Sequence, residues 1–282
     1  NPYPRWRYVS HLESKKTSIA QTINNEIKPN SIIYNINDNK LKVLVAGCGT
    51  GQHILQTQRY QNAQIKCIDL SLSSLSYAQR KINELGMNNV ELIEMDILEV
   101  SLLEEKFDII ECAGVLHHMD DPYKGLKALL DILKSSGFLR LGLYSELARQ
   151  EIIKSRNYIT NEKLQSNKDN IRDFRKSVFS GQAPEISSLT TSHDFYTLSS
   201  CRDLCFHTKE HRFTINELQE TLKSNELKFL GFSQKQTVKS LYAKYFPNDL
   251  PQTNLQNWVK FEEKHPSIFR GMYQFWVCKS KI

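Results

Sequence analysis

Residues 41–55 decide the fold and read Leu-Lys-Val-Leu-Val-Ala-Gly-Cys-Gly-Thr-Gly-Gln-His-Ile-Leu. The apolar run at 41–46 contains β-branched residues and predicts a buried strand. The strand runs into Gly47, Gly49 and Gly51, and a helical pattern follows. A strand that breaks on glycines and resumes as a helix presents backbone N–H groups and a positive helix N-terminus at the sheet edge. In doubly wound sheets this edge is where ligands bind.

The spacing of these glycines distinguishes two kinds of loop. The dinucleotide fingerprint is Gly-x-Gly-x-x-Gly, and Gln52 stands where that pattern needs its third glycine. The order found here instead resembles the cofactor loop of class I S-adenosylmethionine-dependent methyltransferases. One position departs from that family, which usually has an acidic residue two places before the first glycine, where this chain has Val45.

Strand and helix patterns alternate beyond this loop. Strands are predicted at 64–70, 90–95, 107–112 and 138–144, and helices begin at Ser71 and Pro122, the second ending at Gly137. This alternation predicts right-handed βαβ units and a parallel sheet. Two more strands are predicted at 227–232 and 272–278. The resemblance implies an α/β, Rossmann-like, doubly wound and mostly parallel seven-stranded sheet, with 272–278 antiparallel and a helical and loop cap inserted after the fifth strand.

We divide the chain into four parts. They are an N-terminal arm (1–40), a core that binds S-adenosylmethionine (41–144), an insertion on the substrate side (145–212) and a return to the sheet (213–282). In the arm, Ile19, Ile23 and Ile27 predict a helix, while Tyr3 and Trp6 are interpreted as packing anchors. The insertion is too long for a plain connection between a helix and a strand, and such segments are usually functional.

Composition and charge restrict the class of protein. Forty per cent hydrophobic and 24 per cent charged residues are typical of a globular protein, and no apolar run is long enough to span a membrane. The six cysteines form no secreted-domain framework, which favours a reducing cytoplasm. The chain begins with Asn1 rather than Met, so an upstream domain outside this chain is one expectation.

The net charge of +6 lies entirely in the second half. Residues 1–144 contain 16 Lys+Arg and 16 Asp+Glu, whereas residues 145–282 contain 21 and 15. This asymmetry favours an acidic partner for the second half, although a solvated lysine-rich surface explains it equally well.

The resemblance implies a cofactor site at the ends of the first four strands. Asp69 follows the second strand, where its two oxygens can accept both ribose hydroxyls, although it could instead simply cap the next helix. Asp96 would accept the adenine amine and Ile97 would pack on the ring. Residues 111–117 would line the methyl donor. The cofactor residues expected in full are Gly47, Cys48, Gly49, Gly51, Asp69, Leu70, Asp96, Ile97, Cys112, Ala113 and Gly114.

On the substrate side we expect Tyr144, His193, Tyr196 and His117 to act in methyl transfer. The insertion would roof the site and select the substrate, or else dock another subunit. His117 begins a His-His-Met-Asp-Asp-Pro stretch that resembles a common one in the family, where the first His packs near the cofactor, so proton transfer is the less favoured role. Because the cofactor carries the electrophile, the sequence need not show a general base.

A zinc site is not expected. Cys201, Cys205, His207 and His211 could supply four ligands, but their spacing crowds them and matches no known finger. These side chains are interpreted as lining the approach to the substrate.

These features together predict an S-adenosylmethionine-dependent methyltransferase acting on a protein side chain, with lysine first. The whole chain resembles a bacterial group associated with tetratricopeptide repeats and protein lysine methyltransferases, in residues such as Asn1–Trp6 and 194–207. The alternatives are an RNA or small-molecule methyltransferase, or a catalytically silent scaffold. A protein or acidic substrate is favoured over nucleic acid because Ala113-Gly114-Val115-Leu116 replaces the Asn/Asp-Pro-Pro-Tyr/Phe signature of amino-group nucleic-acid methylation.

Overall fold

The structure, a computed structural model, describes residues 15–33, 40–207 and 209–280, so Tyr3 and Trp6 lie outside it. The strands are β1 (Leu41–Ala46), β2 (Ala63–Asp69), β3 (Val90–Glu94), β4 (Phe107–Ala113), β5 (Leu133–Leu143), β6 (Leu227–Phe232) and β7 (Tyr273–Lys279). The α-helices are α1 (Ile19–Ile27), α2 (Gln52–Thr57), α3 (Leu72–Glu84), α4 (Pro122–Ile132), α5 (Gln150–Asn161), α6 (Lys168–Phe179), α7 (Leu198–Cys205), α8 (Ile215–Ser224), α9 (Gln236–Tyr245) and α10 (Leu255–Lys264).

One seven-stranded sheet runs through the molecule in the order β3-β2-β1-β4-β5-β7-β6. The pairings from β3 to β5 are parallel, and β7 is antiparallel to both of its neighbours, as predicted for 272–278. The order reverses between β1 and β4, so the glycine loop after β1 lies at the topological switch point of the sheet.

Helices cover both faces of the sheet and give it two cores. On one face, α1, α2 and α3 contribute Ile23, Ile54, Leu75 and Ala78 against Val43 and Val45 of β1. On the other face, α4, α8 and α10 contribute Leu129, Leu218, Trp258 and Phe261 against Leu44 and Ile110. Adjacent residues of β1 thus point to opposite cores, which accounts for its continuous apolar run.

Several helix ends follow from local sequence. Ser71 is the N-cap of α3 and accepts the Ser74 N–H, and Gly86 follows that helix with φ of 63°. Thr214 and Glu217 form a capping box at the start of α8.

The boundary between α4 and β5 was predicted wrongly. The helix ends at Ile132 and the strand begins at Leu133, not at residue 138. Leu133 continues the apolar spacing of the helix, but it pairs with Phe107 of β4 and is buried there. Gly137 lies inside the strand, where a Cβ would come within 2.7 Å of the Leu133 side chain and 3.1 Å of the Asp108 carbonyl oxygen. Close packing, rather than a helix stop, therefore requires this glycine.

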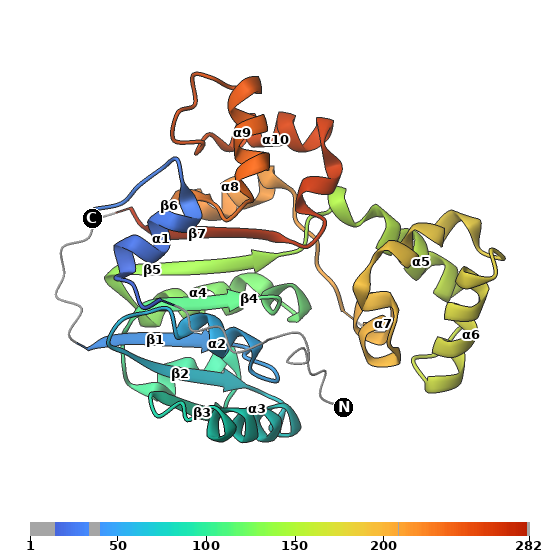
Figure 1. Cartoon of the computed structure of the whole chain (residues 1–282), viewed down its shortest axis with the longest axis horizontal. Coiled ribbons are helices and arrows are strands. Elements are labelled where there is room, and N and C mark those ends of the chain that lie inside the picture. Colours follow the sequence, from blue (N-terminus) through green and yellow to red (C-terminus); the bar gives the residue numbers. More distant parts are fainter. Residues whose placement is uncertain (1–14, 34–39, 208, 281–282) are drawn as a thin grey trace.

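The segment after β5 forms a helical lobe, residues 150–206, containing α5, α6 and α7. It has its own core, which includes Phe174, Phe195 and Cys201. Figure 1 shows the lobe beyond the end of the sheet toward which the parallel strands point. The inserted cap after the fifth strand is therefore present at the ligand-binding edge.

Candidate active site

The glycine loop after β1 is held in an unusual backbone conformation. Gly47, Gly49 and Gly51 have φ of 75°, 53° and 95°, a region that favours glycine. At Gly47 a Cβ would meet the Val115 side chain at 2.3 Å, whereas nothing lies within 4 Å of a Cβ built on Gly49. Gly47 is therefore required by packing, while Gly49 leaves space above the loop that a ligand can approach.

The carboxylate of Asp69 joins the ends of β1 and β2. One oxygen accepts the Gly49 N–H at 2.7 Å and the other accepts the Ser71 N–H at 2.9 Å. The second bond agrees with the capping interpretation, but the first ties the side chain to the glycine loop. Each carboxylate oxygen has a further lone pair, so both can still accept a ligand hydroxyl.

The ends of β3 and β4 contribute to the same edge. Asp96 uses one oxygen to accept the Leu98 N–H at 2.9 Å, and Ile97 beside it is buried. Ala113 and Gly114 end β4, and Gly114 donates its N–H to the Gly142 carbonyl oxygen. This leaves the other Asp96 oxygen as an acceptor close to an apolar side chain.

Three expected cofactor residues have contrasting surroundings. Leu70 is 66% exposed just past β2. Cys48 and Cys112 are buried, so a ligand above the loop would meet the backbone of Cys48 rather than its thiol.

Tyr144, which follows β5, lies between the imidazole of His117 and the guanidinium of Arg149. Its ring stacks on His117 with 3.6 Å between ring centroids, and the Arg149 guanidinium carbon lies 3.6 Å from the Tyr144 centroid. Groups at that distance must cover opposite faces of the ring. The sequence prediction thus placed Tyr144 and His117 in one site, and the structure brings them into contact.

We call His117, Tyr144 and Arg149 the Tyr144 stack. The sequence did not reveal what holds it in place. Arg149 is 4% exposed and makes a bidentate pair with the fully buried Glu210 carboxylate, at 3.1 and 2.8 Å. The His211 N–H donates to the His117 carbonyl oxygen at 2.7 Å, so this part of the chain lies against the turn that follows β4. No spacing pattern joins Arg149 to Glu210, and only the fold brings them together.

His118 and His207 form a second ring contact beside the stack. Their ring centroids are 3.8 Å apart. The Nδ1 atoms of His118 and His207 lie 2.9 and 2.8 Å from the Lys209 carbonyl oxygen, which can only accept, so each ring is placed to donate an Nδ1–H to it. Of the proposed zinc ligands, His207 therefore faces His118, while Cys201 and Cys205 are buried in the lobe core. No group of three or more His, Cys, Asp or Glu side chains suited to a metal occurs among the described residues. The absence of zinc stays a prediction that elemental analysis can test.

His193 and Tyr196 come from a different part of the fold than Tyr144. Both belong to the lobe, where the Tyr196 hydroxyl donates to the Thr190 carbonyl oxygen and its ring packs on Phe179. Any role for these two side chains must therefore come from substrate that contacts the lobe.

Glu111 was expected to line the methyl donor, and that prediction is wrong. Its carboxylate is buried and binds Arg59, Arg140 and the Tyr60 hydroxyl. Burial alone would raise the pKa of Glu111, but the charges of Arg59 and Arg140 bring it below its ordinary value. Glu111 thus belongs to an ion-pair network inside the fold.

His117 is buried, and neither ring nitrogen has a hydrogen-bond partner among the described residues. Burial, followed by the charges of His118 and Arg149, lowers the pKa of His117 to about 2. The imidazole is therefore neutral at physiological pH and is too weak a base to store a proton. It still offers one donor and one acceptor to a ligand.

This burial predicts a loss of stability in acid. The folded pKa of about 2 lies below the ordinary 6.5, so unfolded His117 takes up a proton that the folded protein excludes. The free energy of unfolding that neutral His117 contributes is complete above pH 6.5 and falls as the pH drops toward 2. At about 1.4 kcal/mol per pH unit, it costs about 2 kcal/mol between pH 6.5 and 5. Urea unfolding at pH 7 and 5 should show this loss in the wild type and a smaller one in His117→Phe, which keeps a ring against Tyr144. Equal pH dependence in both proteins would contradict it.

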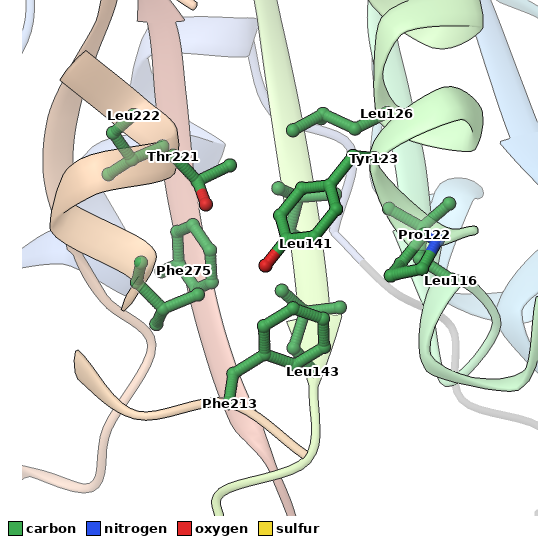
Figure 2. A pocket seen from close by; sticks show the side chains of 11 residues that line it. Leu116, Pro122, Tyr123, Leu126, Leu141, Leu143, Phe213, Thr221, Leu222 and Phe275 are labelled. Carbon is green, nitrogen blue, oxygen red and sulfur yellow. The ribbon is translucent and has the colours of Figure 1, made fainter. Parts of the chain in front are cut away.

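A separate cavity lies on the sheet face between α4 and α8. Figure 2 shows Tyr123 on one side, Thr221 and Leu222 on the other, and Leu141 and Phe275 behind them. Its volume of about 20 Å³ is room for a single water, and its walls are largely apolar. It is therefore too small to hold a cofactor.

Comparisons with known proteins agree with the geometry at the glycine loop. The sequence model of the methyltransferase domain matches residues 43–137. A ubiquinone biosynthesis O-methyltransferase of Histophilus somni is 30% identical over 102 residues, 35% of this chain and 42% of that protein. Residues 43–137 thus form a methyltransferase domain of the class I, S-adenosylmethionine-dependent kind. An uncharacterized Synechococcus protein is 31% identical over 205 residues, 69% of this chain and 49% of the relative.

A solved structure extends the likeness in fold to the rest of the methyltransferase chain. PKMT2 from Rickettsia typhi, in complex with AdoHcy, has a TM-score of 0.72 at 18% identity and covers 100% of this chain and 55% of its own. The chain thus spans about half the length of PKMT2 and of the Synechococcus relative. No helix in the described part of the methyltransferase is both long and apolar enough to cross a membrane.

The cofactor is S-adenosylmethionine, and the observed edge fits it. The open space at Gly49 permits close approach to the loop, the Asp69 oxygens keep free lone pairs, and Asp96 lies beside the buried Ile97. We expect Gly49 and Asp69 to hold the amino-acid and ribose parts and Asp96 with Ile97 to hold adenine.

Proposed function

We propose that this methyltransferase modifies a protein side chain, with the lysine amine as the acceptor. The observation that carries the proposal is the Tyr144 stack. His117 and Tyr144 follow the carboxyl ends of β4 and β5, and Figure 1 shows the lobe beyond this end of the sheet. A methyl group leaving a cofactor held by the loops after β1 to β4 would emerge toward this point.

When bound, S-adenosylmethionine supplies an electrophilic methyl group. The protein must then orient an acceptor and remove its water. The Tyr144 ring is only partly exposed and lies between the neutral His117 and the Arg149 guanidinium. A second cation beside Arg149 is disfavoured, so this site favours an uncharged amine over an ammonium. The pKa of His118 is also lowered by burial, so neither histidine retains the proton that a lysine must lose. We infer that this proton leaves to solvent.

Two further features support a protein acceptor. The lobe, residues 150–206, has an independent core and can present a surface to a macromolecule. PKMT2, a protein methyltransferase, shares the fold over the entire chain, including this lobe. Relatives of the core alone include enzymes named for ubiquinone biosynthesis and for tRNA U34 carboxymethylation, so the core does not select between acceptors.

The acceptor class can be tested with cell extract and radiolabelled S-adenosylmethionine. We expect label that protease removes and nuclease leaves, and methyl-lysine after acid hydrolysis. Label removed by nuclease, or extracted into organic solvent, would replace the protein acceptor by RNA or a small molecule. Cofactor binding without any transfer would favour a silent scaffold.

Tyr144→Ala should reduce methyl transfer by about 10-fold, or about 1.4 kcal/mol, because it removes the ring edge beside which the acceptor would be oriented. Cofactor affinity should change little. Tyr77→Ala on α3 is the control, since that ring packs on Arg80 at the surface. His193→Ala and Tyr196→Ala should impair transfer to protein but spare a small amine acceptor. Normal turnover in Tyr144→Ala would contradict the placement of the acceptor.

A further inference from the structure

A second cavity lies away from the lobe, between the end of α1 and α9. Its volume is about 470 Å³, within the range of small-molecule sites. Figure 1 shows α1 at the left and α9 at the top, both away from the lobe at the right. The lining includes Lys28, Pro29, Gln236, Lys239, Phe246 and Gln252. None of these residues belongs to the methyl-transfer site described above.

Lys239 is a buried cation with few acceptors. It is 4% exposed, and among the described residues its ammonium donates to the Glu26 carbonyl oxygen alone, although an ammonium has three donors. The Glu26 carboxylate is occupied elsewhere, by Arg140, Ser233 and Trp276. Burial lowers the pKa of Lys239 to about 8, although the negative charge of Glu26 acts in the other direction and raises it. A negative ligand in the cavity would supply the missing partner.

The first turn of α9 adds positive potential on the same wall. Gln236 and Ser240 line the cavity, and the N-cap residue Lys235 provides no side-chain hydrogen bond to the helix N-terminus. Lys28 contributes a second ammonium from the end of α1. The acidic lining residue Asp249 is already bound by the Tyr242 hydroxyl and by backbone N–H groups.

Gln252 supplies an unused acceptor. It is 7% exposed, its Nε2 donates to the Lys239 carbonyl oxygen at 2.9 Å, and its Oε1 is buried without a partner in the part of the chain that the structure describes. The Nε2 bond fixes the amide orientation, so Oε1 can only accept. A ligand that suits this wall therefore carries a donor as well as a negative group.

We propose that this cavity binds a small phosphorylated ligand that bears a hydroxyl group. The phosphate would lie against Lys28, Lys239 and the N-terminus of α9, and the hydroxyl would donate to Gln252 Oε1. Two ammonium groups and a helix N-terminus suit a dianion better than a single carboxylate. Pro29 and Phe246 supply apolar contact for the rest of the ligand.

Calorimetric titration of the full chain tests this site, with S-adenosylhomocysteine present to occupy the cofactor site. The probes are inorganic phosphate, ribose 5-phosphate and ribose, in chloride buffer at pH 7. We expect ribose 5-phosphate to bind at least about threefold more tightly than phosphate, and ribose not to bind. The fourth probe is an oligonucleotide that has no terminal phosphate. Binding of this oligonucleotide, without binding of ribose 5-phosphate, would overturn the small-ligand proposal.

Three variants assign the binding to these residues. Lys239→Met should abolish binding and Lys28→Ala should weaken it about 5- to 10-fold, while Lys244→Ala, an exposed lysine of α9 outside the cavity, should leave it unchanged. If Lys239→Met fails to fold, the comparison of ligand affinity between Lys28→Ala and Lys244→Ala tests the proposal by itself. Equal losses in those two variants, or no phosphate binding by the wild type, would overturn the proposal. Equal affinity for phosphate and ribose 5-phosphate would overturn the role of Gln252. These titrations measure ligand binding and not methyl transfer, so their outcome does not depend on the acceptor proposed above.

Discussion

Asp69→Ala should weaken binding of S-adenosylhomocysteine by about 100-fold or more, with the fold intact. The substitution removes two charge-assisted hydrogen bonds to the ribose, each worth about 1.5–3 kcal/mol. It also removes the acceptor that holds the Gly49 N–H at 2.7 Å, so the glycine loop loses part of its support. The N-terminus of α3 keeps its Ser71 cap, which limits the cost to folding.

Isothermal titration calorimetry measures this affinity, and Glu99→Ala is the matched control. Glu99 is an exposed acid just past β3, so its removal changes net charge by the same amount near the same edge. Urea unfolding of both variants separates loss of binding from loss of folding. Unchanged affinity in Asp69→Ala would remove the ribose acceptor and leave Asp69 as a structural tie between β2, the glycine loop and α3.

Local patterns were enough to predict the sheet and the place of the glycine loop at its edge. The apolar run at 41–46, the three glycines and the capping residue Ser71 each act over a few neighbouring residues, so they can be interpreted without knowledge of the fold. Asp69 could be placed for a similar reason, since residues at the carboxyl ends of parallel strands meet at one edge.

Contacts between distant residues could not be predicted in this way. Arg149 and Glu210 are 61 positions apart and share no period, yet their bidentate pair holds the Tyr144 stack. Glu111 failed for the opposite reason. Its position at a strand end suggested the ligand edge, but side chains alternate along a strand and its carboxylate turns to Arg59 and Arg140 on a face of the sheet. Strand ends therefore identify the edge, while the pleat decides which side chains reach it.

Two of the open glycines with positive φ, Gly49 and Gly86, provide the sharpest test of the cofactor loop. Gly49 and Gly86 have φ of 53° and 63°, and a Cβ on either would meet nothing within 4 Å. Alanine at either position should therefore cost a similar free energy of unfolding, about 1–2 kcal/mol for the left-handed backbone alone.

Only Gly49→Ala should also weaken cofactor binding, because its methyl group would occupy the space above the loop. Overpacking of this kind costs about 2 kcal/mol, which corresponds to about 30-fold in affinity. Gly86→Ala, at the end of α3 away from this loop, should bind S-adenosylhomocysteine as the wild type does. Urea unfolding and calorimetry on the pair measure the two effects separately. Wild-type affinity in Gly49→Ala would show that the ligand does not approach the backbone at this glycine, and the open space above it would then need another explanation.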